Sequence, residues 1–183
     1  NPERLNCSMS DIYRMILNVP EAMTAAEIRE AVSSRHRERL ETVLATHKHP
    51  ERYDLRGVLM FGVAECRRSL LAPELLKNED IEAFGELMRI SHDGDRVARA
   101  ARRRNGSWKM EKYRGDYSDD ALLRLSEDLA SEDPERVLRA QLHRRPGSYA
   151  CSLPRIDHMV DLVNSIPGVY GAQLGGAGLG GCI

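Results

Sequence analysis

Helical periodicity is the feature that most restricts the fold of this sequence. Between Asp54 and Pro73, apolar residues recur at steps of three or four; they are Leu55, Leu59, Val63, Cys66 and Leu70. This spacing predicts an amphipathic helix, and Pro73 is expected to end it. Aromatic residues make up only 5% of the chain, which is low for an all-β sandwich. A helix-rich domain is therefore expected.

Helix-start signals predict further helices on both sides of this one. Thr24-Ala25-Ala26-Glu27 forms a capping box before a charged helical stretch that runs from Ile28 to about Ala45. The other expected caps are Asn78, Ser118, Asp133 with Pro134 after it, and Ser152 with Pro154 after it. The helix after Asn78 should end near Gly94, and the helix after Ser152 should end at Pro167-Gly168.

Composition and charge exclude several classes of protein. The chain has 183 residues, of which 42% are hydrophobic and 30% charged, so it can bury the core of one ordinary domain. No apolar stretch approaches the roughly 20 residues that span a membrane. The N-terminus lacks a signal-peptide pattern, which favours a cytoplasmic location. Neither membrane attachment nor secretion is expected.

Metal binding is not expected either. The four cysteines lie far apart in the sequence, at positions Cys7, Cys66, Cys151 and Cys182. Without the short spacing of a zinc site they are interpreted as reduced thiols. His47-Lys48-His49 lacks a third ligand nearby and is interpreted as an exposed turn before Pro50.

A basic segment extends from Arg96 to Tyr117. It contains Trp108 and the basic residues Arg96, Arg99, Arg102, Arg103, Arg104, Lys109, Lys112 and Arg114. Cations beside aromatic rings are typical of nucleic-acid interfaces. However, 27 Lys and Arg stand against 28 Asp and Glu, for a net charge of −1. We therefore favour a solvated basic face and expect no nucleic-acid partner.

A glycine cluster at the C-terminal end is the strongest chemical signal. Val169–Leu174 is predicted to be a strand, and seven of the 14 glycines lie between Gly168 and Gly181. Such density allows positive φ angles and lets successive amides point into a concavity that suits phosphate. A flexible tail has the same composition. The helix and strand before the cluster favour a shaped loop.

Three segments, in order, resemble the C-terminal domain of the GHMP kinases, and galactokinases most. Pro167–Ala172 with Gly176–Cys182 resembles the third motif of that superfamily. Phe84–His92 resembles its F-G-x-L-M-x-x-S-H helix, and Tyr149–Asp157 resembles its Y-x-x-S-C-P-E-L-D segment. These segments place residues 54–94 and 148–183 in the C-terminal lobe, with residues 96–147 as an insertion. On this resemblance, residues 1–183 form one domain, and the N-terminal ATP-binding domain is absent from the chain.

The resemblance implies an ATP-dependent sugar kinase that uses Mg and phosphorylates a monosaccharide hydroxyl. The implied fold is α+β, a helix-rich domain with a small antiparallel, ferredoxin-like sheet whose last strand is truncated. The phosphate and substrate loop would be formed by Gly176, Ala177, Gly178, Leu179, Gly180 and Gly181. These residues would act through position and backbone electrostatics. Catalytic residues are expected in the missing lobe, so the chain alone should be inactive.

The sequence departs from the galactokinase pattern near the proposed loop. Gly175 and Gln173 stand where galactokinases usually have Thr and Arg, and the C-P-E-L-D stretch has become residues 153–157, Leu-Pro-Arg-Ile-Asp. The serine-rich ATP loop of the family is also not found. These departures leave open arabinose, galacturonate or another hexose derivative as the sugar. They also leave open an inactive sugar or nucleotide sensor that acts through a protein partner.

His92, at the end of the Phe84–His92 segment, allows two interpretations. It could make a polar contact near the substrate, or it could interact with the terminal carbonyls of its own helix. A histidine near a helix end more often does the latter, and this is our expectation.

Overall fold

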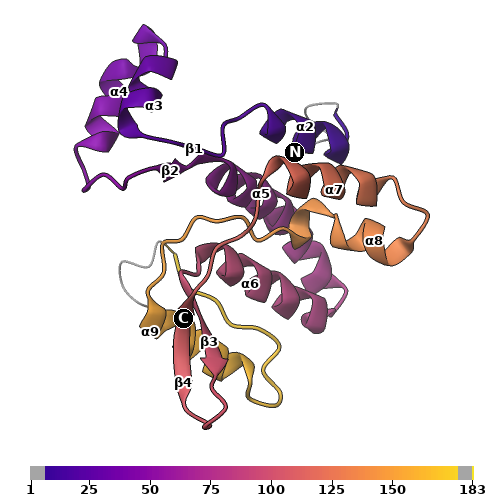
Figure 1. Ribbon diagram of the computed structural model, residues 1–183. Helices are drawn as coiled ribbons and strands as arrows, with labels where there is room; N and C mark the ends of the chain where they lie inside the picture. Colours follow the sequence, from indigo (N-terminus) through magenta and orange to yellow (C-terminus); the bar gives the residue numbers. More distant parts are fainter. Residues whose placement is uncertain (1–6, 177–182) are drawn as a thin grey trace.

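Helices dominate the structure, and its two sheets are small (Figure 1). The structure is a computed structural model that describes residues 7–176 and 183. Its helices are α2 (Met9–Leu17), α3 (Ala25–Ala31), α4 (Ser34–Leu44), α5 (Leu55–Lys77), α6 (Ile81–Asp95), α7 (Asp119–Leu129), α8 (Pro134–Arg139), the 3₁₀ turn η1 (Leu142–Arg144) and α9 (Pro154–Asn164). Its strands are β1 (Ala22–Met23), β2 (Tyr53–Asp54), β3 (Ala98–Arg102) and β4 (Trp108–Lys112). The predicted helix-rich α+β class is confirmed.

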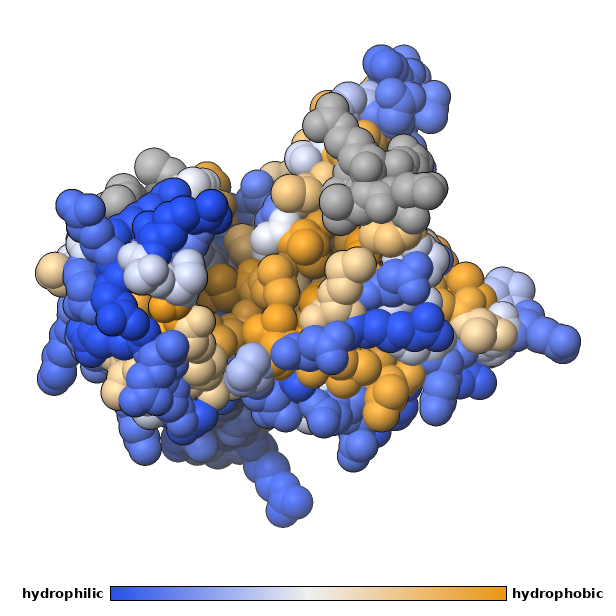
Figure 2. Space-filling view, turned by 90° about the horizontal axis from the view of Figure 1, so that it is seen from above, coloured by the Kyte–Doolittle hydropathy of each residue, from blue (hydrophilic) through white to orange (hydrophobic). Residues whose placement is uncertain are grey.

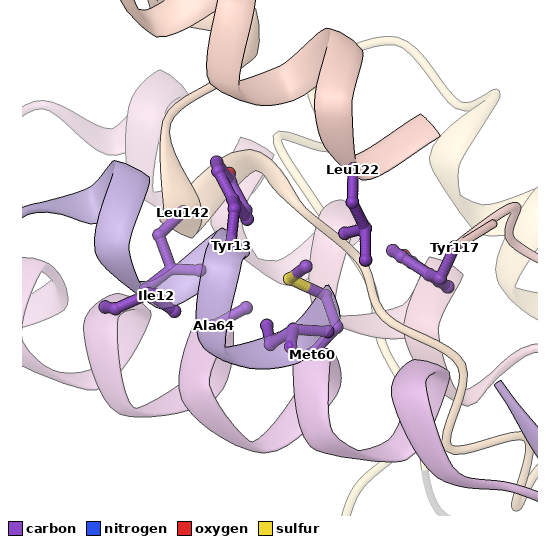
Figure 3. Packing of buried hydrophobic residues seen from close by; sticks show 8 residues of the cluster. Ile12, Tyr13, Met60, Ala64, Tyr117, Leu122 and Leu142 are labelled. Atoms are coloured by element: carbon purple, nitrogen blue, oxygen red, sulfur yellow. The ribbon is translucent and has the colours of Figure 1, made fainter. Parts of the chain in front are cut away.

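The main core forms where α5 meets α2, α7 and η1 (Figure 3). Its buried residues are Ile12, Tyr13, Ile16, Met60, Ala64, Tyr117, Leu122 and Leu142. Tyr13 is fully buried, and its hydroxyl donates to the Ala140 carbonyl at 2.6 Å, so the one polar atom of this side chain is satisfied. The segment 96–147 therefore contributes three residues to the same core as the rest of the chain.

Each sheet is a two-stranded antiparallel ladder, and β1 pairs with β2 where the α3–α4 pair joins the body. Strand β3 pairs with β4 from Ala98↔Lys112 to Arg102↔Trp108. This hairpin was not predicted from the sequence, because β3 consists of Ala and Arg and carries no β-branched residue. Two backbone amides of β3 are bound by carboxylates of α9. Asp157 accepts from the Ala98 amide at 2.8 Å, and Asp161 accepts from the Ala100 amide at 3.3 Å.

The strand predicted at Val169–Leu174 is wrong. Among the described residues this segment joins neither ladder. Its polar groups are bound by side chains, since the Val169 carbonyl accepts from Arg89 at 3.4 Å and the Leu174 amide donates to His92 at 3.2 Å. A ladder partner is therefore not needed to satisfy these groups.

Three predicted helix boundaries are corrected by the structure. Helix α5 passes through Pro73, because proline removes only one helical bond and the Asn78 amide still closes on Glu74 at 3.0 Å. Asn78 thus ends α5, while Asp80 caps α6 by accepting from the Ala83 amide at 3.0 Å. Ser152 does not cap α9, because the helix begins at Pro154 and Leu153 stands at the cap position.

Other predicted helix signals are confirmed, with one interruption. Thr24 and Glu27 form the capping box of α3, and the side chains of Ser118 and Asp133 cap α7 and α8. The stretch from Ile28 to about Ala45 is divided into two helices, because Val32 adopts an extended conformation between α3 and α4.

Hydrophobic residues also reach the surface. In the view from above, they gather in the middle of the molecule between hydrophilic areas (Figure 2). Among the described residues, no helix is both long enough and apolar enough to cross a membrane.

Candidate functional site

The segment that leads into the glycine cluster is held closely against α6. A Cβ atom on Gly85 would overlap the Tyr170 carbonyl, and a Cβ atom on Gly171 would lie 2.7 Å from the Gly85 Cα. The two backbones can approach this closely only because both positions lack a side chain. On the other side, Ala172 and Leu174 pack against α9. Residues 170–174 are thus fixed between two helices.

His92 of α6 supports this segment from the interior. Its side chain is fully buried, and its Nδ1 accepts the hydrogen bond from the Leu174 amide at 3.2 Å. Because Nδ1 is an acceptor, the proton of the neutral ring lies on Nε2. That atom faces Oδ1 of Asp157 in α9 at 3.3 Å. The expected contact of His92 with the carbonyls at its own helix end is wrong, since the ring faces Leu174 and α9.

Asp157 completes the connection from α6 to α9 and the hairpin. The side chain is fully buried, and its Oδ2 accepts from the amides of Val97 at 3.0 Å and Ala98 at 2.8 Å. Burial alone would raise the pKa of this carboxyl group. Interactions with the side chains of His92 and Ser152 and the hydrogen bonds from the two amides outweigh burial, and the pKa is lowered. Asp157 is therefore a buried carboxylate that these four groups keep ionised.

A second ion pair joins the same elements one turn further along. Arg96 is almost completely buried, and its guanidinium donates to both carboxylate oxygens of Asp161, at 2.7 and 3.0 Å. It also donates to Asp93 at 2.8 Å. This bidentate geometry fixes the end of α6 against α9. The expected place of Arg96 on the solvated basic face is wrong, because the side chain is buried in this pair.

Cys151 lies beside this network as a thiol. Its Sγ donates to Asp95 Oδ1 at 3.2 Å, and burial, followed by the contact with Asp95, raises its pKa to about 12. It is therefore not an activated nucleophile. Cys7, Cys66 and Cys151 are all free, as the sequence predicted.

Only the first residue of the predicted phosphate loop can be described. Gly176 has a φ of +66°, and among the described residues a Cβ atom placed on it would meet nothing within 4 Å. Ala177, Gly178, Leu179, Gly180 and Gly181 lie outside the described residues, so their predicted role is untested.

Metal ligands do not gather at this site in the part of the chain that the structure describes. No group of three or more His, Cys, Asp or Glu side chains there could hold an ion. His47 Nε2 instead lies 2.8 Å from the Tyr53 hydroxyl.

The lowered pKa of Asp157 predicts a pH-dependent contribution to stability. A carboxyl group with a lowered pKa stabilises the fold above its unfolded value of 3.8, and this contribution is lost as the pH falls through the folded value. We expect the difference in unfolding free energy between the native chain and Asp157→Asn to shrink from pH 6 to pH 3. Urea unfolding at both pH values measures it. A difference that stays constant would contradict the lowered pKa.

Comparison with known proteins relates the chain to galactokinases. It is 30% identical to the galactokinase of Roseiflexus sp. (strain RS-1) over 142 residues, which cover 78% of this chain and 24% of that protein. It is 32% identical to human galactokinase over 107 residues, which cover 57% of this chain and 23% of that protein. The chain thus spans about a quarter of the length of these curated relatives. No family model and no solved structure matches it.

Proposed function

We propose that this chain is the C-terminal part of an ATP-dependent sugar kinase, which transfers a phosphoryl group to a monosaccharide hydroxyl. The observation that carries the proposal is the way residues 170–174 are held in a chain similar to galactokinases. Gly85 lets their backbone approach α6, and the buried His92, which faces Asp157, accepts from the Leu174 amide. This support would hold the following glycine loop in place without a bound ligand. The sensor alternative receives no support from the comparisons.

In the reaction, the role of this chain would be to position the reactants. Phosphoryl transfer is catalysed mainly by alignment of the reactants and by fixed dipoles that stabilise charge on the transferring group. We infer that the amides from Gly176 to Gly181 would face the phosphates, with residues 170–174 as their fixed base. ATP with Mg would supply the phosphoryl group, but no step through the metal is assigned to the described residues. The acid or base that handles the hydroxyl proton would lie outside this chain.

A coupled assay of ADP release by the complete protein tests the proposed activity. The assay contains Mg-ATP and, in turn, galactose, arabinose or galacturonate, with a no-sugar control. We expect ADP release that depends on one of these sugars. Galactose is the first substrate to test, because the relatives are galactokinases. Turnover with none of these sugars would contradict the proposal.

Two glycines provide a matched test of the loop. Gly176 and Gly168 both have positive φ angles, +66° and +87°, and a Cβ atom would meet nothing within 4 Å at either. Alanine at either position therefore carries a similar backbone strain, about 1–2 kcal/mol. We expect Gly176→Ala to lower kcat/KM about tenfold or more, because alignment of the phosphates is lost. Gly168→Ala, at the end of α9, should change kcat/KM less than about twofold. Equal losses in both variants would show that only stability was affected.

A further inference from the structure

A cavity of about 400 Å³ lies between β2, the end of β4 and the loop 148–150. Its size is within the range of small-molecule sites. None of residues 170–176 lines it. The side chains that carry the argument are Arg52, Tyr53, Lys112, Tyr113, Arg114 and Tyr149.

The charge on the cavity wall is positive. Arg114 pairs with Asp54 at 3.2 Å, and Arg52 pairs with Glu27 at 3.5 Å. Lys112 has no ion-pair partner among the described residues. Among the described lining residues, one side chain is acidic, Asp54, and three are basic, Arg52, Lys112 and Arg114. The adjoining hairpin adds to this charge, because only one acidic residue, Glu111, lies between Arg99 and Arg114. Such a field attracts an anion.

Tyrosine rings form the flat parts of the wall. The Tyr149 ring stacks on Phe61 with 5.2 Å between centroids and 13° between planes, and the Arg99 guanidinium lies 4.7 Å from the centre of the Tyr113 ring. Both rings are thus held in place from outside the cavity. In the described part of the chain, neither tyrosine hydroxyl has a hydrogen-bond partner, and an apolar face with a free polar edge suits a partly polar ligand.

The loop that carries Tyr149 is strained. Ala150 has a φ of +56°, which is uncommon for a residue with a side chain. It is held there because its amide and that of Tyr149 both donate to the Gly94 carbonyl, at 3.0 and 2.8 Å. Strain that the surrounding structure maintains is a feature of ligand sites.

We propose that this cavity binds an anionic monosaccharide, with Lys112 and Arg114 at its negative group and the tyrosine rings against the sugar. The negative group is a phosphate or a carboxylate. Lys112, Tyr113 and Arg114 belong to the segment 96–147, so this segment would build the site. The inference does not depend on kinase activity, because none of residues 170–176 lines the cavity and the test measures binding alone.

Isothermal titration calorimetry of the chain at low ionic strength tests the proposal. The probes are galactose 1-phosphate, galacturonate, neutral galactose and inorganic phosphate. We expect one or both anionic sugars to bind at least about tenfold more tightly than galactose and than phosphate, which corresponds to about 1.4 kcal/mol. Binding of the sugar phosphate alone identifies a phosphate site, and binding of the uronate identifies a carboxylate site. Equal binding of phosphate or of galactose, or no binding at millimolar concentration, would overturn the proposal.

A matched pair of lysine variants locates the binding. Lys112→Gln should weaken binding about tenfold, since it removes a charged contact at the cavity. Lys109→Gln removes the same charge from the same strand, but Lys109 does not line the cavity and binding should stay within about twofold. Lys112→Arg keeps the charge and should restore most of the affinity. Equal effects of the two glutamine variants would show that only the overall charge matters, and the assigned site would be wrong.

Discussion

Replacing Asp157 with alanine is expected to lower the free energy of unfolding by about 3–5 kcal/mol, as for other buried groups that lose a charged partner. The carboxylate is fully buried and accepts from the amides of Val97 and Ala98, while its second oxygen faces His92. Alanine leaves these donors without a partner away from water, and an unsatisfied buried donor costs about 1–3 kcal/mol. Urea unfolding monitored by circular dichroism measures the change.

Asp120→Ala is the matched control for this prediction. Asp120 is exposed in the first turn of α7, so its loss should cost less than about 1 kcal/mol, as for a surface charge at a helix N-terminus. We expect the complete Asp157→Ala protein to lose sugar-dependent turnover as well, because residues 170–174 are no longer supported. If Asp157→Ala were as stable as Asp120→Ala, the buried network would not hold this part of the fold together.

Replacing Arg56 with methionine should have an effect of similar size, about 3–5 kcal/mol. The guanidinium is buried at the start of α5 and donates to the carbonyl of Leu17, the last residue of α2, at 2.9 Å and to that of Val19 at 2.6 Å. It also donates to the Tyr117 carbonyl at 3.3 Å and to Asp119 at 2.6 Å, at the start of α7. Methionine fills most of the space but cannot donate, so the accepting oxygens lose their partner.

The control for Arg56 is Arg124→Met on α7. The Arg124 side chain is 63% exposed and lies 3.9 Å from Asp116, so this contact should contribute less than about 1 kcal/mol. Thermal unfolding of both variants against the native chain measures the difference. A small loss for Arg56→Met would mean that α2 and α7 are held on α5 by apolar packing alone.

Local signals in the sequence were sufficient for many helices. The capping box at Thr24 and the caps at Ser118 and Asp133 depend on residues two or three positions apart, and the structure confirms them. The same local rules failed at α9. Ser152 has a side chain that can cap a helix, but α9 begins at Pro154, with Leu153 at the cap position.

The candidate site was only partly predictable. The glycine content indicated where the backbone could take a positive φ, and Gly176 does so. The segments around His92 and Asp157 were recognised through their resemblance to a family, but their contact was not predicted. The cavity beside Lys112 was missed completely, because its walls come from four separate parts of the chain.

By itself, the sequence determined the helix-rich class, the starts of α3, α7 and α8 and the position of the glycine cluster, because each depends on neighbours within one or two turns. Only the tertiary structure decided what His92, Asp157 and Arg96 do. Their partners lie about 60 to 80 residues away in the chain, so a change of packing would give the same side chains different contacts. Burial then makes those contacts obligatory, because polar groups removed from water must find partners within the protein.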